Sequence, residues 1–398
     1  MFRIALRNVL RNKRRTLLGL CIIVVSIVVV FIALGYVQEL YHILEKDQII
    51  KYGHFQIASE GFWDRKIKER RLLGPEDIEK IKEILKGKEE IIDYTTTLGF
   101  SGIFGTEENS TPVMVEGVEL NAEQLIRIES GTDLSNNDGK QILVGKGVKE
   151  ALNLEIDEWA SIITENLQGD FSAQSLKVTG SYTTGTTQLD NVSTLVPLAF
   201  AQKILKTDGV DKIKVTLREN NLNSEMMKEI NKDFKTAGLE VDLKSWFELA
   251  DYFRQIVAFF NMISFFIVSV IFVLVFFGIL NLTSMSFFER MKEIGTIRAI
   301  GTTANQVFLQ LLQEALILGI IGGIIGVASS YGLGRLINFL DISYMPPDLS
   351  VEIPFNISIN MKNAIIPFVL TIITTSISAL YPAIKASRLN VVETIIHT

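Results

Sequence analysis

The chain has 398 residues, of which 48% are hydrophobic and 21% charged, with one cysteine and a formal net charge of −6. The apolar content excludes an intrinsically disordered protein, and the single cysteine excludes a small module held together by disulfides. The central segment 41–254 is acidic and would repel phosphate, so we expect no nucleic-acid partner.

Residues 1–16 are predicted to form a cytoplasmic amphipathic helix. Phe2, Leu6, Val9 and Leu10 share one helical face, and basic residues occupy the others. A helix of this kind lies in the headgroup plane of the lipid bilayer. A solvated positive anchor that only sets the topology fits the same residues.

Residues 17–45 are predicted to form the first transmembrane helix and an extension, or stalk, beyond the membrane. No residue from Thr16 to Gln38 is Asp, Glu, Lys, Arg or His, and this run is long enough to cross a hydrocarbon core of about 30 Å. Apolar residues continue at helical spacing beyond Val37 as far as Leu44. The helix should therefore continue outside the bilayer.

Residues 46–245 are predicted to form a large extracytoplasmic α+β domain, because helical and strand-like patterns alternate along them. The predicted helices lie at 75–85, 121–128, 146–152, 200–205 and 224–237. The predicted strands lie at 111–118, 141–144, 160–164, 176–178, 193–198 and 212–217. The segment 131–140 is rich in Asn, Asp, Ser and Gly and is a predicted loop.

Residues 246–288 are predicted to form one continuous helix that contains a second stalk and the second transmembrane helix. Ser245 and Glu248 have the spacing of a capping box at its start. Such a helix is about twice as long as the hydrocarbon core is thick. The excess should stand outside the membrane and pack against the extension of the first span.

Two more uncharged runs predict transmembrane helices at 315–335 and 363–384, which gives four spans arranged as one plus three. Basic residues at the N-terminus, in the short loop and in the tail place these three segments in the cytoplasm and the 46–245 domain outside. The connecting segments are a cytoplasmic coupling loop at 289–314, an extracytoplasmic loop at 336–362 and a cytoplasmic tail at 385–398.

The third predicted span is rich in glycine. It contains two overlapping small-xxx-small spacings, formed by Gly319, Gly322, Gly323 and Gly326. Such spacings let another helix approach closely, either within the chain or across a dimer. Ordinary glycine enrichment in membrane helices is the alternative explanation.

The sequence lacks the patterns of a catalytic or metal site. No segment fits the phosphate-binding pattern G-x-x-x-x-G-K-[ST], and the three histidines lie far apart without a companion cysteine. Leu20 stands before Cys21 where a lipoprotein signal requires a small residue, so Cys21 is expected to face lipid or pack between helices. We therefore expect a non-catalytic chain without a cofactor of its own.

The short cytoplasmic loop is the most informative segment. From Met291 to Ile300 an apolar residue recurs at every third position among charges of both signs. This ridge is suited to docking a cytoplasmic partner.

The run Glu-Arg-x-x-Glu-Ile-Gly-x-x-Arg-Ala-x-Gly from Glu289 to Gly301 resembles the signature of the FtsX-like permease family. That family includes macrolide exporters and lipoprotein-releasing permeases. The run from Tyr381 to Glu393 is similar to the closing segment of the family, except that Val391 stands where proline is usual. The basic N-terminal run resembles the lipoprotein-releasing branch, as do pieces at 52–57, 145–147 and 179–205.

The resemblance implies the permease subunit of a type VII ABC transporter. Such a subunit works as a homodimer or heterodimer of permeases, with a cytoplasmic ATPase dimer that binds ATP and magnesium. The outer domain is implied to have two parts, one near 45–115 and 200–245 and one inserted between them. The residues implied to couple to the ATPase are Glu289, Arg290, Glu293, Ile294, Gly295, Arg298, Ala299 and Gly301.

The function implied first is ATP-driven release of lipoproteins from the inner membrane to a periplasmic carrier. Two alternatives stay open at this point. One is tripartite efflux of a drug or toxin through a periplasmic adaptor protein, and the other is a non-transporting regulator of a cell-wall hydrolase.

Overall fold

The computed structural model describes residues 5, 7–8, 11, 13–64, 71–119, 127–135, 139–220, 223–347 and 349–388. The chain divides into two compact units. The helical unit contains the described residues of Met1–His42, Ile256–Ser343 and Pro354–Thr398. The sheet unit contains those of Ile43–Gln255 and Tyr344–Ile353.

Within the described part of the chain, four helices are long and apolar enough to cross a membrane, as the uncharged runs predict. They are α2 (Lys13–Tyr52), α9 (Asp251–Glu289), α11 (Ala304–Phe339) and α12 (Met361–Ser387). A helix satisfies its own backbone hydrogen bonds, which makes it a stable way to cross hydrocarbon. The arrangement of one span before the large domain and three after it is confirmed.

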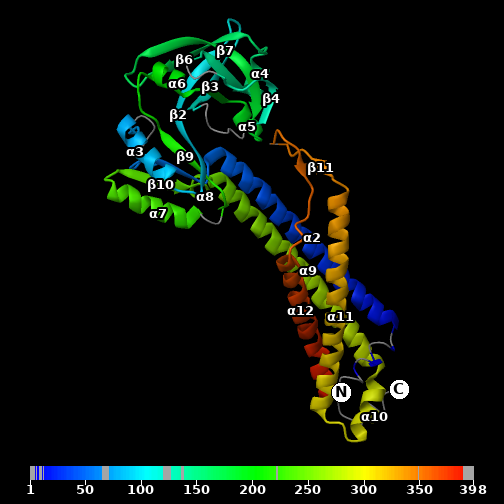
Figure 1. Ribbon diagram of the computed structural model, residues 1–398. Coiled ribbons are helices and arrows are strands. Elements are labelled where there is room, and N and C mark those ends of the chain that lie inside the picture. The colour runs from blue at the N-terminus through cyan, green and yellow to red at the C-terminus, as the bar shows by residue number, and fades with distance from the viewer. Residues whose placement is uncertain are drawn as a thin grey trace. The chain divides into compact units, whose positions relative to one another are not determined.

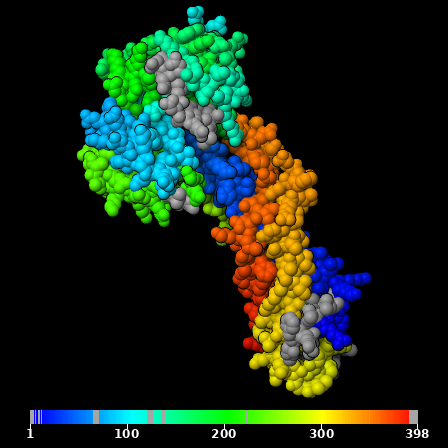
Figure 2. Space-filling view, viewed as in Figure 1, coloured from blue at the N-terminus to red at the C-terminus, as the bar shows by residue number. Residues whose placement is uncertain are grey.

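Within the helical unit these helices pack through small clusters of aliphatic side chains. Ile23 and Ile27 of α2 are buried against Val275 and Ile279 of α9. Helices α11 and α12 lie side by side (Figures 1 and 2), and the close contacts of α11 glycines with side chains of α12 are described below.

The prediction of one continuous helix from Trp246 to Phe288 is wrong. A short helix, α8 (Trp246–Leu249), ends at Ala250, whose φ of −88° and ψ of 65° are not helical, and α9 starts afresh at Asp251. The buried Trp246 holds α8 in place, because its backbone N–H donates to the carbonyl of His54 and its ring packs on Phe253.

The capping box at the start of α8 is confirmed. The Ser245 hydroxyl accepts a hydrogen bond from the backbone N–H of Glu248, and the Glu248 carboxylate accepts one from the backbone N–H of Ser245.

The sheet unit contains one mixed sheet of ten strands. Its order is β10-β1-β9-β2-β3-β8-β5-β7-β4, and β6 pairs with both β2 and β7. The pairs β3–β8 and β5–β7 are parallel, and the other pairs are antiparallel. The bounds are β1 (Phe55–Ser59), β2 (Ile91–Gly105), β3 (Ser110–Val118), β4 (Arg127–Gly131), β5 (Gln141–Gly145), β6 (Trp159–Glu165), β7 (Phe171–Thr183), β8 (Ser193–Pro197), β9 (Lys212–Leu217) and β10 (Val241–Ser245).

In the described residues, five helices besides α8 accompany this sheet, so the expected α+β class is confirmed. They are α3 (Pro75–Lys86), α4 (Lys146–Ala151), α5 (Thr187–Asp190), α6 (Leu198–Leu205) and α7 (Asn223–Thr236). Of the helix predicted at 121–128, residues 121–126 lie outside the described residues, and Arg127 and Ile128 begin strand β4 instead.

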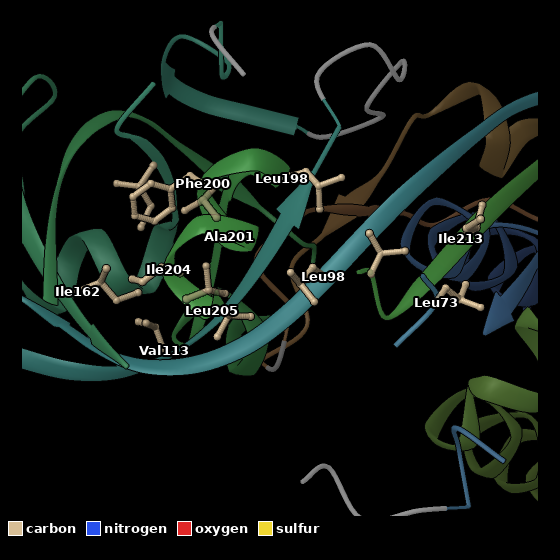
Figure 3. Close-up of a cluster of buried hydrophobic side chains, with 14 of the residues drawn as sticks. Leu73, Leu98, Val113, Ile162, Leu198, Phe200, Ala201, Ile204, Leu205 and Ile213 are labelled. Atoms are coloured by element: carbon tan, nitrogen blue, oxygen red, sulfur yellow. The ribbon is translucent and has the colours of Figure 1, made fainter. Parts of the chain in front are cut away.

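Strand β2 joins the two halves of the sheet. Its first half, Ile91–Thr97, pairs with β9, and its second half, Thr97–Gly105, pairs with β3. One large hydrophobic cluster runs across both halves, with Leu198, Ala201 and Leu205 of α6 in the same cluster as the strand residues (Figure 3). The two expected parts of the domain therefore share one sheet and one core.

One charged cluster is built into this sheet. The Glu116 carboxylate of β3 lies 3.0 Å from Nζ of Lys214 on β9. Burial alone would raise the pKa of Glu116, but the charges of Lys214 and Lys212 outweigh it and lower the pKa to about 2.

The segment Tyr344–Ile353 between α11 and α12 belongs to the sheet unit. The buried Asp190 carboxylate accepts hydrogen bonds from the hydroxyls of Thr183, Thr184 and Ser350. The Ser350 backbone N–H also donates to the carbonyl of Gly185. This polar cluster fixes the segment to the sheet unit.

Candidate functional site

The segment with the family signature folds into a helix between two turns. Helix α9 ends at Glu289, Arg290 caps the next helix with φ of −100° and ψ of 11°, and α10 runs over Met291–Ala299. Gly301 then takes a φ of +115°, which favours glycine. In Figure 1, α10 lies at one end of the helical unit.

Helix α11 begins with a second capping box. The Thr303 side chain accepts from the N–H of Gln306, whose own side chain accepts from the N–H of Thr303. The predicted loop 289–314 is therefore mostly helical, because α11 starts at Ala304 and not at the predicted residue 315.

A buried ion pair fixes the start of α10 against α11. The Nη1 of Arg290 lies 3.0 and 3.1 Å from the two carboxylate oxygens of Glu314. The two side chains are only 10% and 14% exposed. Breaking a buried pair by removing one partner costs about 3–5 kcal/mol, so this contact strongly constrains the turn.

The N-terminal segment joins the same cluster. Nδ2 of Asn8 donates to Glu314 at 2.7 Å, and Arg11 contacts both carboxylate oxygens of Glu293 at 3.1 Å. Arg15 pairs with Glu289. Polar residues that precede or begin α2 therefore contact three acidic side chains, one each on α9, α10 and α11.

Burial divides the predicted apolar ridge into two parts. Ile294 is buried with Phe287, Val307 and Ala386, and Met291 packs against them. By contrast, Ile297 is 44% and Ile300 is 83% exposed. The second part of the ridge is therefore available to a partner, whereas the first part holds α10 in the unit.

One exposed face of α10 carries Glu293 and Ile297 and continues to Ile300, the residue directly after the helix. These three residues lie at helical spacing i, i+4 and i+7. The eight residues implied to couple to an ATPase differ in burial. Those buried in the unit are Arg290, Ile294 and Gly295, and Arg298 is half-buried. Those exposed are Glu289, Glu293, Ala299 and Gly301.

The four glycines predicted to pack helices closely all do so within the chain. A Cβ on Gly319 or Gly323 would lie 2.5 or 2.6 Å from a side-chain atom of α12. A Cβ on Gly322 or Gly326 would lie 2.7 or 2.9 Å from a side-chain atom of α2. Each small-xxx-small pair therefore serves a different neighbouring helix.

Two contributors to the site carried no assigned role in the sequence. They are Glu314, which neutralises Arg290, and Asn8, which hydrogen-bonds Glu314. The available signal was that Glu314 is the acidic residue next to a long uncharged run.

Among the described residues, no group of three or more His, Cys, Asp or Glu side chains could hold a metal ion.

Comparison with known proteins identifies two families along the chain. Residues 16–233 match the MacB-like periplasmic core domain, and residues 265–391 match the FtsX-like permease C-terminal family. The second match contains α10 and the glycine-rich helix α11.

Three relatives show how much of the chain is shared. The uncharacterized ABC transporter permease MJ1507 of Methanocaldococcus jannaschii is 23% identical over 98% of this chain and 96% of its own. The uncharacterized ABC transporter permease YknZ of Bacillus subtilis is 23% identical, over 84% and 86%. The probable export ATP-binding/permease protein MacB of Pseudomonas entomophila is 24% identical over 84% of this chain, which spans 51% of that protein. Other relatives are matched over smaller shares of their length, such as 25% and 16%.

Proposed function

Because this chain belongs to the family with a MacB-like periplasmic core domain, we propose that it is the permease subunit of an ABC transporter that works by mechanical transmission. Two relatives of similar extent bear the name ABC transporter permease, which supports the proposal. In this proposal a cytoplasmic ATPase dimer binds ATP and magnesium, and a second permease subunit completes the membrane part. The chain sits in the inner membrane with both termini in the cytoplasm.

The proposed contact with the ATPase is the exposed face of α10. The observation that supports it is the combination of a helix whose start is fixed by the buried Arg290–Glu314 pair with an apolar end that stays exposed. A helix fixed at one end transmits a push to the elements that hold it. Exposed isoleucines supply the apolar area that a protein interface buries at its centre.

A substitution in this face tests the contact. We expect Ile300→Asp to lower the ATP turnover stimulated by the permease on the order of tenfold at limiting ATPase, because it places a charge in an apolar interface. The matched control is Lys292→Ala, which removes an exposed side chain from another face of α10. Unchanged turnover in Ile300→Asp, with normal membrane insertion, would contradict the proposal.

For the cargo we propose lipoproteins, released from the inner membrane to a periplasmic carrier. The support is the similarity of the N-terminal run and of several outer-domain pieces to the lipoprotein-releasing branch. Export of a drug or toxin through an adaptor protein is supported equally, because one MacB relative is named a macrolide export ATP-binding/permease protein and another a probable export ATP-binding/permease protein.

Depletion of the protein separates the cargo classes. If lipoproteins are the cargo, depletion should leave lipoproteins in the inner membrane. Drug or toxin sensitivity with normal lipoprotein sorting would instead indicate efflux. A division or cell-wall defect with neither change would indicate a regulator of a cell-wall hydrolase.

A further inference from the structure

A cavity of about 80 Å³ lies inside the helical unit, at the end that carries α10. Helices α2, α9, α11 and α12 all contribute to its wall. A single water needs about 10–15 Å³ of such space, so the cavity has room for a polar group larger than one water. The proposed ATPase contact does not use it.

The lining of the cavity is amphipathic. Gly19, Ile279, Leu282 and Leu318 form an apolar wall, and these residues belong to helices that are apolar enough to cross a membrane. Charged and polar side chains from the N-terminal segment and from the α9–α11 corner line the rest. A ligand that fits both parts has an apolar portion and a polar head.

The charged side chains on the polar side of the cavity differ in how completely they are hydrogen-bonded. The Glu314 carboxylate accepts hydrogen bonds from Arg290, Asn8 and Gln310, so it needs no further donor. Arg15 pairs with Glu289 through Nη2. Its other terminal nitrogen, Nη1, is buried and has no hydrogen-bond partner among the described residues.

A buried donor without an acceptor is costly, and a guanidinium recognises phosphate especially well. Two residues that line the cavity, Asn8 and Arg15, belong to a strongly basic part of the sequence. The first fifteen residues contain no acid and six basic residues, Arg3, Arg7, Arg11, Lys13, Arg14 and Arg15. Such a cluster next to a membrane helix attracts anionic lipids.

We propose that this cavity binds the phosphate headgroup of an anionic membrane lipid, with Arg15 as the principal donor. The phosphate accepts from the guanidinium of Arg15, and the acyl chains lie along the apolar side of Ile279 and Leu282 toward the bilayer. Bound lipid would connect α2 to α9 and α11 beside the start of α10.

Native mass spectrometry of the full chain in detergent tests this proposal. The probes are phosphatidylglycerol, phosphatidylcholine and inorganic phosphate. We expect the chain to retain phosphatidylglycerol preferentially and Arg15→Gln to weaken its retention at least about tenfold, as loss of a charged hydrogen bond would. Arg14→Gln is the matched control, because it removes an equal charge from an exposed neighbouring residue.

A second variant leaves every charge in place. Ser286 lines the cavity, and Ser286→Leu should fill it and also weaken retention of phosphatidylglycerol. Equal losses in Arg15→Gln and Arg14→Gln would overturn the proposal, because they would indicate attraction without a site. Unchanged binding in Ser286→Leu, equal retention of phosphatidylcholine, or Arg15-dependent binding of inorganic phosphate without lipid would each overturn it too. The experiment needs no ATPase, so its result is independent of the proposed transport function.

Discussion

The helical unit uses glycine in two different ways, on α11 and after α10. On α11, a Cβ at Gly319, Gly322, Gly323 or Gly326 would meet a side chain of α2 or α12 within 3 Å. At Gly301 nothing lies within 4 Å of the Cβ position, but the φ of +115° disfavours any other residue. These four glycines of α11 therefore make room for neighbouring helices, whereas Gly301 only turns the backbone.

This difference separates a fixed region from a free one. Helix α11 is enclosed on two sides, by α2 and by α12. Helix α10 is fixed at its start by Arg290 and Ile294, but its end at Ile300 is exposed and the following turn touches little. A partner that binds the exposed end of α10 would therefore contact a helix that is fixed to the unit only at its start.

The largest loss of stability is expected at the contact between α10 and α11, where the free and the fixed region adjoin. Arg290→Ala leaves Glu314 as a buried charge without its cation, and should lower the free energy of unfolding in detergent by about 3–5 kcal/mol. Chemical denaturation of the purified chain measures this. The double variant Arg290→Met with Glu314→Met is the control and should recover much of the loss, since it removes both charges. A loss below about 1 kcal/mol in Arg290→Ala would show that the pair does not fix α10.

The second prediction compares two glycines of one helix. Gly322→Ala would place its Cβ 2.7 Å from Ile23 and should destabilise the unit by about 1–3 kcal/mol through overpacking. Gly332 is exposed, with nothing within 4 Å of its Cβ position, so Gly332→Ala should stabilise α11 by about 0.5–1 kcal/mol. Thermal unfolding in detergent measures both the expected loss of stability in Gly322→Ala and the expected gain in Gly332→Ala. A loss of the same size at both positions would mean that helix packing is not the reason for Gly322.

Much of this architecture could be predicted from the sequence because it depends on local patterns. Uncharged runs indicate membrane helices regardless of their neighbours, and the Ser245 capping box is a pattern of four residues. The strands at 141–144 and 160–164 also carry their own signal, since each buries two β-branched residues: Ile142 and Val144 in the first, and Ile162 and Thr164 in the second.

Other features depend on contacts between distant residues and could not be predicted. Strand β2 is rich in threonine and contains Gly99, Gly102 and Gly105, so it has little apolar alternation of its own; its pairing partners determine it. Ala250 favours helix, yet the burial of Trp246 interrupts the helix there. Similarly, nothing local assigns Gly322 to α2 and Gly323 to α12.

A smaller effect is expected at the turn after α10. Gly301→Ala meets no neighbour, so its cost comes from the backbone alone and should be about 1 kcal/mol or slightly more. Because the turn sets the direction of α10, the variant should also reduce stimulated ATP turnover more than its stability loss explains. Denaturation and turnover measured on the same preparation check this. Gly238→Ala, at a φ of +70° with open space in the sheet unit, is the control that should lose similar stability but no turnover.

The smallest effect is expected for the exposed contact between the N-terminal segment and α10. Arg11 and Glu293 are 58% and 51% exposed, so solvent screens their attraction, and Arg11→Ala should lower the free energy of unfolding by less than about 1 kcal/mol. This loss should shrink further in high salt, where the pair is already screened. Lys13→Ala removes a nearby exposed charge and is the control. A salt-independent loss of about 2 kcal/mol or more would instead mean that the N-terminal segment fixes α10 as firmly as Arg290 does, and that the end of α10 is less free than its exposed isoleucines indicate.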